Sequence, residues 1–92
     1  MAYKIKRYTY RQAKRLGVKV KPSKVKGKKI DVFKNDKKLV SVGAIGYKDY
    51  PTYMQTEGRK VANERRRLYK IRHAKDRKVK GSAGYYADQL LW

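Results

Sequence analysis

The fold is decided by one stretch of the sequence, residues 28–46, which reads KKIDVFKNDKKLVSVGAIG. Apolar residues alternate with a polar one in two runs, IDV at 30–32 and VSV at 40–42, and this period of two is that of a half-buried β-strand. The segment KNDK at 34–37 separates the runs and supplies turn residues. The stretch therefore predicts a β-hairpin. A lone hairpin is only marginally stable in water, so other elements must cover its apolar face.

Two short helices are predicted downstream of the hairpin. Asp49 can cap a helix that runs through Met54, with Pro51 in its first turn. Ser82 can cap a C-terminal helix that ends in Leu-Leu-Trp at 90–92. We expect these last three side chains to be buried, since burial of each large apolar side chain is worth about 1.5–3 kcal/mol.

A longer, basic helix is predicted between the two short ones. Thr56 is a possible cap for a helix that begins near residue 57 and runs to about residue 78. Val61, Leu68 and Ile71 recur at helical spacing and form a narrow apolar stripe, with Ala62 and Tyr69 beside them. We expect this stripe to face the domain.

The first 29 residues differ from the rest. Thr9 with Gln12 three positions later fits a capping box, and Gly17 fits the position after a short helix. The segment that follows alternates Val and Lys until Pro22 breaks the pattern. We interpret residues 1–29 as a basic arm with a short helix that otherwise lies extended on a partner.

The predicted architecture is one small α+β domain. Its compact part, residues 30–92, holds the hairpin packed against the long basic helix and the short C-terminal helix, and residues 1–29 form the N-terminal arm. The chain has 92 residues, a length that suits a single domain.

Composition excludes several classes of protein. The chain has no Cys and one His, so it can form neither a disulfide nor a Cys- or His-based zinc site. No apolar run approaches the roughly 18 residues that a membrane span needs. The first ten residues, MAYKIKRYTY, contain no apolar core of a secretory signal. We therefore expect no membrane partner and no cofactor.

The charge is the strongest compositional feature. Twenty-seven Lys and Arg against seven Asp and Glu give a net charge of +20, which repels other copies of the chain and attracts polyanions. Twelve bases and no acid lie in residues 1–29, and eleven bases and two acids lie in residues 59–80. The residues expected to contact a polyanion or partner are Arg7, Arg11, Lys14, Arg15, Lys19, Lys21, Lys24, Lys26, Arg59, Arg65, Arg66, Arg72, Lys75 and Arg77.

The run of three arginines at 65–67 points in three directions around a helix. At least one of them must face the domain, where it would pair with Glu64, Asp49 or Asp88. The other two are available to bind phosphate or carboxylate in a bidentate manner.

Two further motifs have a structural and a functional interpretation. His73 with Asp76 could be a general base, but the sequence shows no nucleophile or second His to accompany it. We therefore expect His73 to be structural or to contact a phosphate or a partner. The segment GAIG at 43–46 could clamp a nucleic-acid backbone, as in KH modules. It follows a predicted strand, so a sharp exit from the hairpin is the favoured interpretation. We expect no enzymatic activity.

Five segments together resemble a family of small basic proteins of large double-stranded DNA viruses and tailed phages. They are AKRLGVKVKPS, KKIDVF, GAIGYKDYPTY, RRRLYKIRH and GYYADQLLW, and the likeness covers roughly residues 9–92. Many relatives carry a Trp between the long helix and the end of the chain, whereas here the one Trp is Trp92. The resemblance implies a viral setting and gives no activity.

These observations favour a non-enzymatic virion protein. The first hypothesis is an auxiliary, or minor, capsid protein present in many copies, which binds the capsid lattice through the major capsid protein or other virion subunits. Contact with packaged double-stranded DNA is compatible with this role. The alternative is a sequence-nonspecific nucleic-acid-binding or DNA-condensing protein; a ribosomal-type RNA binder explains the charge equally well. The expected location is the virion, and the host cytoplasm during assembly.

Overall fold

The predicted β-hairpin is present in the computed structural model, which describes residues 3–92. Strands β2 (Lys28–Lys34) and β3 (Lys37–Ala44) pair antiparallel. Asn35 and Asp36 between them have φ angles of 53° and 65°, the left-handed values of a two-residue type I′ turn. Asn and Asp adopt these angles more readily than other non-glycine residues, so the turn residues favour this pairing of the strands.

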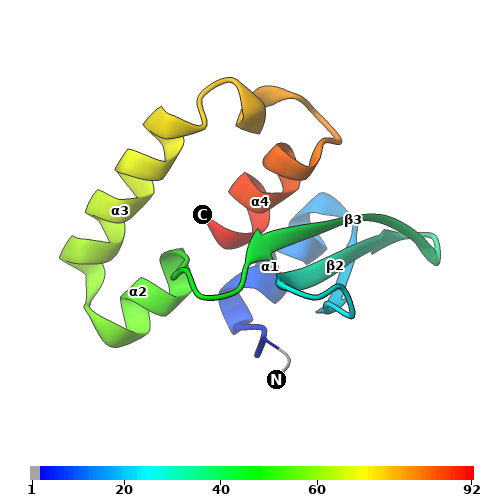
Figure 1. Ribbon diagram of the computed structural model, residues 1–92, viewed down its shortest axis with the longest axis horizontal. Coiled ribbons are helices and arrows are strands. Elements are labelled where there is room, and N and C mark those ends of the chain that lie inside the picture. The colour runs from blue at the N-terminus through cyan, green and yellow to red at the C-terminus, as the bar shows by residue number, and fades with distance from the viewer. Residues whose placement is uncertain (1–2) are drawn as a thin grey trace.

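A third strand and four helices complete the fold (Figure 1). Strand β1 (Lys19–Pro22) pairs antiparallel with β2, which gives the sheet order β1-β2-β3. The helices are α1 (Arg7–Leu16), α2 (Tyr50–Thr56), α3 (Arg59–Arg72) and α4 (Ala83–Leu91), and a 3₁₀ turn, η1 (Asp76–Lys78), precedes α4. The predicted α+β class is confirmed. No helix within residues 3–92 has both the length and the apolar character to span a membrane.

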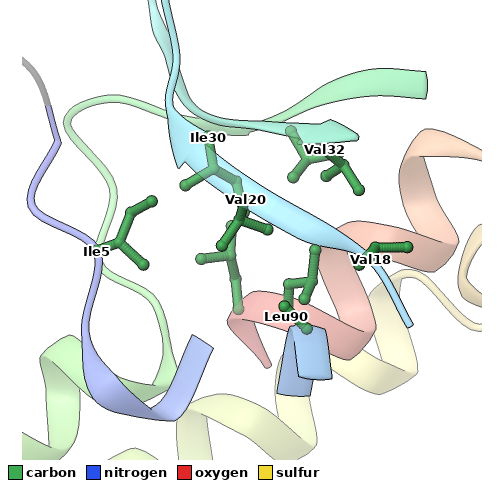
Figure 2. Close-up of a cluster of buried hydrophobic side chains, with 9 residues drawn as sticks. Ile5, Val18, Val20, Ile30, Val32 and Leu90 are labelled. Carbon is green, nitrogen blue, oxygen red and sulfur yellow. The ribbon is translucent and has the colours of Figure 1, made fainter. Parts of the chain in front are cut away.

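The core lies between one face of the sheet and helices α1 and α4. The opposed pairs Val20–Val32 and Ile30–Val42 supply the sheet side. Leu90 from α4 packs against them and is fully buried. The labelled members of this cluster in Figure 2 are Ile5, Val18, Val20, Ile30, Val32 and Leu90. The prediction that the last three side chains are buried is confirmed for Leu90 and Leu91, whereas Trp92 is partly buried and packs against the core cluster.

The prediction of an extended N-terminal arm is wrong for the described residues 3–29. Ile5, Ala13, Val18 and Val20 are all core residues, so the segment belongs to the compact domain. The Val–Lys alternation that suggested a partner-bound strand instead forms the edge strand β1. Its apolar residues face the core, and its proline, the last residue of an edge strand, lies where a missing N–H is tolerated.

The predicted short helix in this segment is confirmed as α1, but its capping box is not. The helix begins after Lys6, whose side chain makes no capping hydrogen bond. It ends at Leu16, and the Gly17 that follows has a φ of 74°. The Thr9 hydroxyl donates to the Leu90 carbonyl at 2.9 Å, and Gln12 Nε2 donates to the Gln89 carbonyl at 3.1 Å. These carbonyls are among the last four of α4, which have no partner within their own helix. Thr9 and Gln12, which resembled a cap for α1, therefore donate hydrogen bonds to the carbonyls at the C-terminal end of α4.

Helix α2 begins as predicted, and α3 does not. Asp49 caps α2, accepting a hydrogen bond from the Thr52 amide, with proline in the first turn. Gly58, with a φ of 89°, separates α2 from α3, so Thr56 lies in α2 and is not a cap for α3. Helix α3 ends at Arg72, and η1 follows separately, so the prediction of one helix to about residue 78 is wrong.

The predicted apolar stripe of α3 is buried only at its flanking residues, Ala62 and Tyr69, and not along its centre. Leu68 is 39% exposed and Ile71 is 62% exposed, whereas Ala62 and Tyr69 are buried. The reason is the position of the helix: α3 packs against α2 and lies apart from the sheet in Figure 1. The buried Tyr69 of α3 therefore packs on the ring of Trp92, whereas the sequence had suggested that the long helix packs on the hairpin. The predicted C-terminal helix is confirmed, and Ser82 caps it by accepting from the Tyr85 amide.

Gly43 and Gly27 provide a matched test of how tightly α4 packs on the sheet. Both have similar positive φ angles, 84° and 83°. A Cβ at Gly43 would lie 2.7 Å from Leu91 Cδ1, whereas one at Gly27 would meet nothing within 4 Å. Gly43→Ala should therefore lower the free energy of unfolding by about 1–3 kcal/mol more than Gly27→Ala. Urea unfolding followed by circular dichroism measures the difference. Equal losses would contradict this packing.

Candidate polyanion-binding surface

Three of the seven acidic residues are buried and bind groups of the domain itself. Asp31 on β2 accepts hydrogen bonds from the hydroxyls of Ser23 and Ser41, both at 2.6 Å, and from the Lys24 amide. Burial acts to raise the pKa of Asp31, but these hydrogen bonds and the Lys38 ammonium 3.6 Å away outweigh it, and the pKa lies below its usual range. Asp31 is therefore charged and fully engaged inside the structure.

Asp49 is the most highly connected of the three. Its carboxylate lies 2.9 Å from Lys29 Nζ, accepts from the Tyr3 hydroxyl at 2.6 Å, and accepts from the Thr52 hydroxyl at 2.7 Å. Burial acts to raise the pKa of Asp49. The hydrogen bonds from Thr52 and Tyr3 and the charge of Lys29 lower it by a larger amount, so the pKa lies below its usual value. The same burial and the neighbouring carboxylate raise the pKa of Tyr3 far above its usual value, so the hydroxyl remains a donor.

Asp88 holds α4 to the chain segments beside it. Its side chain is 1% exposed. Its carboxylate lies 2.7 Å from Lys70 Nζ on α3 and 3.9 Å from an Arg77 nitrogen on η1. Burial and then the charge of Asp88 raise the pKa of Tyr69 to about 12. The third buried acid therefore also has its charge matched within the domain.

The four remaining acids do little to neutralise the surface. Glu57 pairs with Lys48, and Glu64 pairs with Arg67, while Asp36 and Asp76 are exposed. Six of the 27 Lys and Arg side chains form ion pairs within residues 3–92, which leaves 21 that form none. The acids are thus used mainly inside the fold, and the outer surface displays nearly all of the net positive charge.

Twelve of the fourteen basic residues expected to bind a partner are exposed, and two are not. Arg66 is half-buried: its guanidinium lies 3.5 Å from the ring centre of Tyr50 and donates to the Tyr8 hydroxyl at 3.2 Å. The prediction that one arginine of the 65–67 run faces the domain is confirmed, but its contacts are aromatic and none is an acid. Arg77 is half-buried beside Asp88. Both are structural residues.

The exposed twelve do not form one patch. Eight follow α1, β1 and the loop to β2, and four follow α3 and the turn after it; the two sets are Arg7, Arg11, Lys14, Arg15, Lys19, Lys21, Lys24 and Lys26, and then Arg59, Arg65, Arg72 and Lys75. In Figure 1, α3 lies at one end of the long axis, which measures 37 Å, and the tip of the β-hairpin lies at the other. The charge is therefore spread over the molecule.

A groove that the sequence did not predict lies between α3, the end of α4 and the loop from β3 to α2. Its volume is about 540 Å³. Four aromatic residues and three exposed cations line it, and no Asp or Glu does so within residues 3–92; they are Tyr47, Tyr53, Tyr69 and Trp92, with Lys48, Arg65 and Arg72. Tyr47 and Tyr53 are close in the sequence, whereas Tyr69 and Trp92 join the groove only through tertiary packing.

Aromatic stacking builds one wall of the groove. The rings of Tyr69 and Trp92 are 4.4 Å apart and nearly parallel, at 7°, and His73 stacks on Tyr69 at 4.4 Å. His73 Nδ1 lies 3.7 Å from Asp76, and its Nε2 lies 3.5 Å from Arg72 Nε. Within residues 3–92, no three His, Asp or Glu side chains gather so as to hold a metal ion. His73 thus contributes to packing.

The comparisons with known proteins add a partial family match. Residues 18–60, which run from just before β1 to the start of α3, match a family of unknown function (DUF5754). This is less than half of the 92 residues, and it includes both Lys29 and Asp49. No curated protein and no solved structure matches the chain.

Asp49→Ala should destabilise the domain strongly. Removing one partner of a buried ion pair costs about 3–5 kcal/mol, and Lys29 would remain buried at 6% side-chain exposure. Thermal melting and urea unfolding measure the loss.

The control is Glu64→Ala, which removes an exposed ion pair and should leave the melting temperature unchanged. Because the pKa of Asp49 is lowered on folding, its stabilisation is present above the unfolded value of about 3.9 and is lost as pH falls through the lower folded value. Equal melting of the two variants at neutral pH would contradict the assignment.

Proposed function

We propose that this protein is a non-enzymatic, sequence-nonspecific nucleic-acid-binding protein of a virion. The observation that carries the proposal is the separation of charge: three of the seven acids are buried and matched internally, while 21 Lys and Arg side chains form no ion pair within residues 3–92. A surface of one sign attracts a polyanion over long range. Double-stranded DNA is such a polyanion, with one negative charge per roughly 1.7 Å of helix axis.

The arrangement of the basic residues supports binding to phosphates. They are spread over α1, β1 and α3 along a molecule 37 Å long, which is about the length of one turn of B-DNA, roughly 34–36 Å. Phosphate contacts position a protein on nucleic acid without reading its sequence. We therefore propose binding that depends on charge and is indifferent to sequence.

The viral setting of the proposal is supported by the resemblance to small basic proteins of DNA viruses and phages. An auxiliary capsid protein, bound in many copies to the major capsid protein or other virion subunits, is the second candidate. The folded N-terminal segment weakens one argument for it. Of its three valines, which were expected to contact a lattice, Val18 and Val20 are buried in the core and only Val25 is exposed, at 42%. Ile71 and Val79, which are 62% and 59% exposed, favour the auxiliary capsid role. They could contact another protein subunit, and such apolar contacts are not screened by salt.

DNA binding by this protein should weaken steeply as salt rises. A protein that contacts six to ten phosphates loses roughly 10³–10⁵ in affinity between 50 and 200 mM salt. The combined variant Arg7→Gln, Arg11→Gln and Lys14→Gln removes three exposed charges of α1 that form no ion pair within residues 3–92. It should reduce the salt slope by about one for each phosphate that the variant no longer neutralises. Fluorescence anisotropy of a labelled duplex measures both quantities.

Absence of binding at physiological salt would overturn the nucleic-acid proposal. The two candidates separate when purified capsid lattice and DNA compete for the protein at that salt. Transfer of all the protein to DNA supports the first candidate, and retention on the lattice supports the second.

A further inference from the structure

We propose that the groove between α3, the end of α4 and the β3–α2 loop binds single-stranded nucleic acid. Unpaired bases would stack on its aromatic side chains while its cations hold the backbone phosphates. This inference rests on the proposed function and adds to it a specific site and a preference for unpaired strands.

The groove combines aromatic side chains with cations. Proteins that bind single strands without reading sequence place aromatic side chains within a positively charged groove, because every base has a flat π-face. Here the aromatic and cationic side chains occur together, and no acid lines the groove within residues 3–92. A volume of about 540 Å³ also falls within the roughly 300–1,000 Å³ of small-molecule pockets.

Tyr47 presents its ring to solvent. Its side chain projects from the β3–α2 loop and the residue is 76% exposed, the highest value among the exposed large apolar and aromatic residues. The backbone beside it is held, since Lys29 Nζ donates to the Tyr47 carbonyl. An aromatic ring that is largely exposed and whose backbone is held in place can receive a base at little entropic cost.

The cations of the groove lie close to its aromatic side chains. Arg65 and Arg72 are seven residues apart on α3, which places them on one face of the helix about 10 Å from each other. Arg65 lies 5.8 Å from the ring centre of Tyr53, and Lys48 lies 5.6 Å from it. Both cations lie over the Tyr53 ring, and Lys48 is also paired with Glu57. Arg65 and Arg72 form no ion pair within residues 3–92, so they are the cations available for backbone phosphates in the groove that the exposed Tyr47 ring lines.

A duplex fits this groove less well than a single strand. In a duplex each base is covered above and below by its neighbours, so aromatic side chains gain contacts only with unpaired bases. An acidic peptide could satisfy the cations, but it would leave the exposed face of Tyr47 without a planar partner. The observations therefore favour unpaired nucleic acid as the occupant.

The single tryptophan provides a direct readout of this site. Trp92 lines the groove and is the only Trp in the chain, so its selectively excited emission should change when the groove is filled. We expect a single-stranded homopolymer of about 10 nucleotides, within the usual site sizes, to change Trp92 emission and to bind more tightly than a duplex of equal length. Polyglutamate of equal charge should leave the emission unchanged.

Two substitutions locate the effect. Tyr47→Ala should weaken single-strand binding about tenfold, the lower part of the range for loss of one stacked base, and should leave duplex binding unchanged. Tyr10→Ala removes another exposed tyrosine, 51% exposed on α1 and outside the groove, and should change neither. Arg72→Gln should weaken single-strand binding selectively, whereas the triple α1 variant should weaken both forms alike.

The outcomes separate this inference from the function on which it rests. Equal affinity for single strand and duplex, or equal effects of Tyr47→Ala and Tyr10→Ala, would overturn the groove while leaving charge-driven binding intact. A change of Trp92 emission with polyglutamate as large as with the oligonucleotide would show that the occupant is an acidic protein segment. Failure of every nucleic acid to bind at physiological salt would overturn both proposals.

Discussion

The structure depends on one buried carboxylate, Asp49. It caps α2 through the Thr52 amide, pairs with Lys29 of β2, and accepts from the Tyr3 hydroxyl near the N-terminus. One side chain therefore joins three parts of the chain that are far apart in sequence. A buried ion pair contributes little net stability compared with apolar packing, but it penalises arrangements that would leave either charge unpaired. We infer that it selects this arrangement of the N-terminal segment, the sheet and α2. The same lysine binds the Tyr47 carbonyl, so the rim of the groove is positioned by the same contact.

The distribution of acids explains how so basic a chain folds and why it should bind a polyanion. A net charge of +20 destabilises a compact state through self-repulsion. The domain offsets this by burying three aspartates that each neutralise nearby cations. The Lys and Arg side chains that form no ion pair within residues 3–92 then remain on the surface, where only water and salt screen their charge. A ligand that binds the folded form stabilises it by mass action, so a polyanion would relieve the repulsion that the fold itself cannot.

Local features of the sequence predicted the local parts of the fold. The turn at Asn35 and Asp36 and the caps at Asp49 and Ser82 depend on residues close in the chain, and all were predicted. Edge strand β1 was missed because Pro22 is a strand breaker except at an edge, and pairing with β2 is not visible in the sequence of β1 alone. The side chain of Thr9 matched a capping pattern, yet it binds a carbonyl 81 positions away.

The candidate site, like the fold, could be predicted from the sequence only in part. Exposure of most basic residues followed from their number and from the scarcity of acids. The groove could not be predicted, because its wall forms when Trp92 of the C-terminus stacks on Tyr69 of α3. Leu68 and Ile71 were misassigned to the core for a related reason: helical spacing identifies an apolar stripe, but the neighbours of a helix decide which face is buried.

The central claim is that the basic N-terminal segment is part of the core, so that the protein presents a rigid charged surface. Native-state amide hydrogen exchange tests this claim most directly. The Val18 amide donates to the Ala13 carbonyl at 3.0 Å, and the Ser23 amide donates to the Lys29 carbonyl at 3.0 Å. Both should be protected as strongly as amides in the β2–β3 ladder and should exchange with them in one cooperative unfolding event. Exchange of these two amides at the rate of an unfolded chain, while the ladder stays protected, would contradict the account.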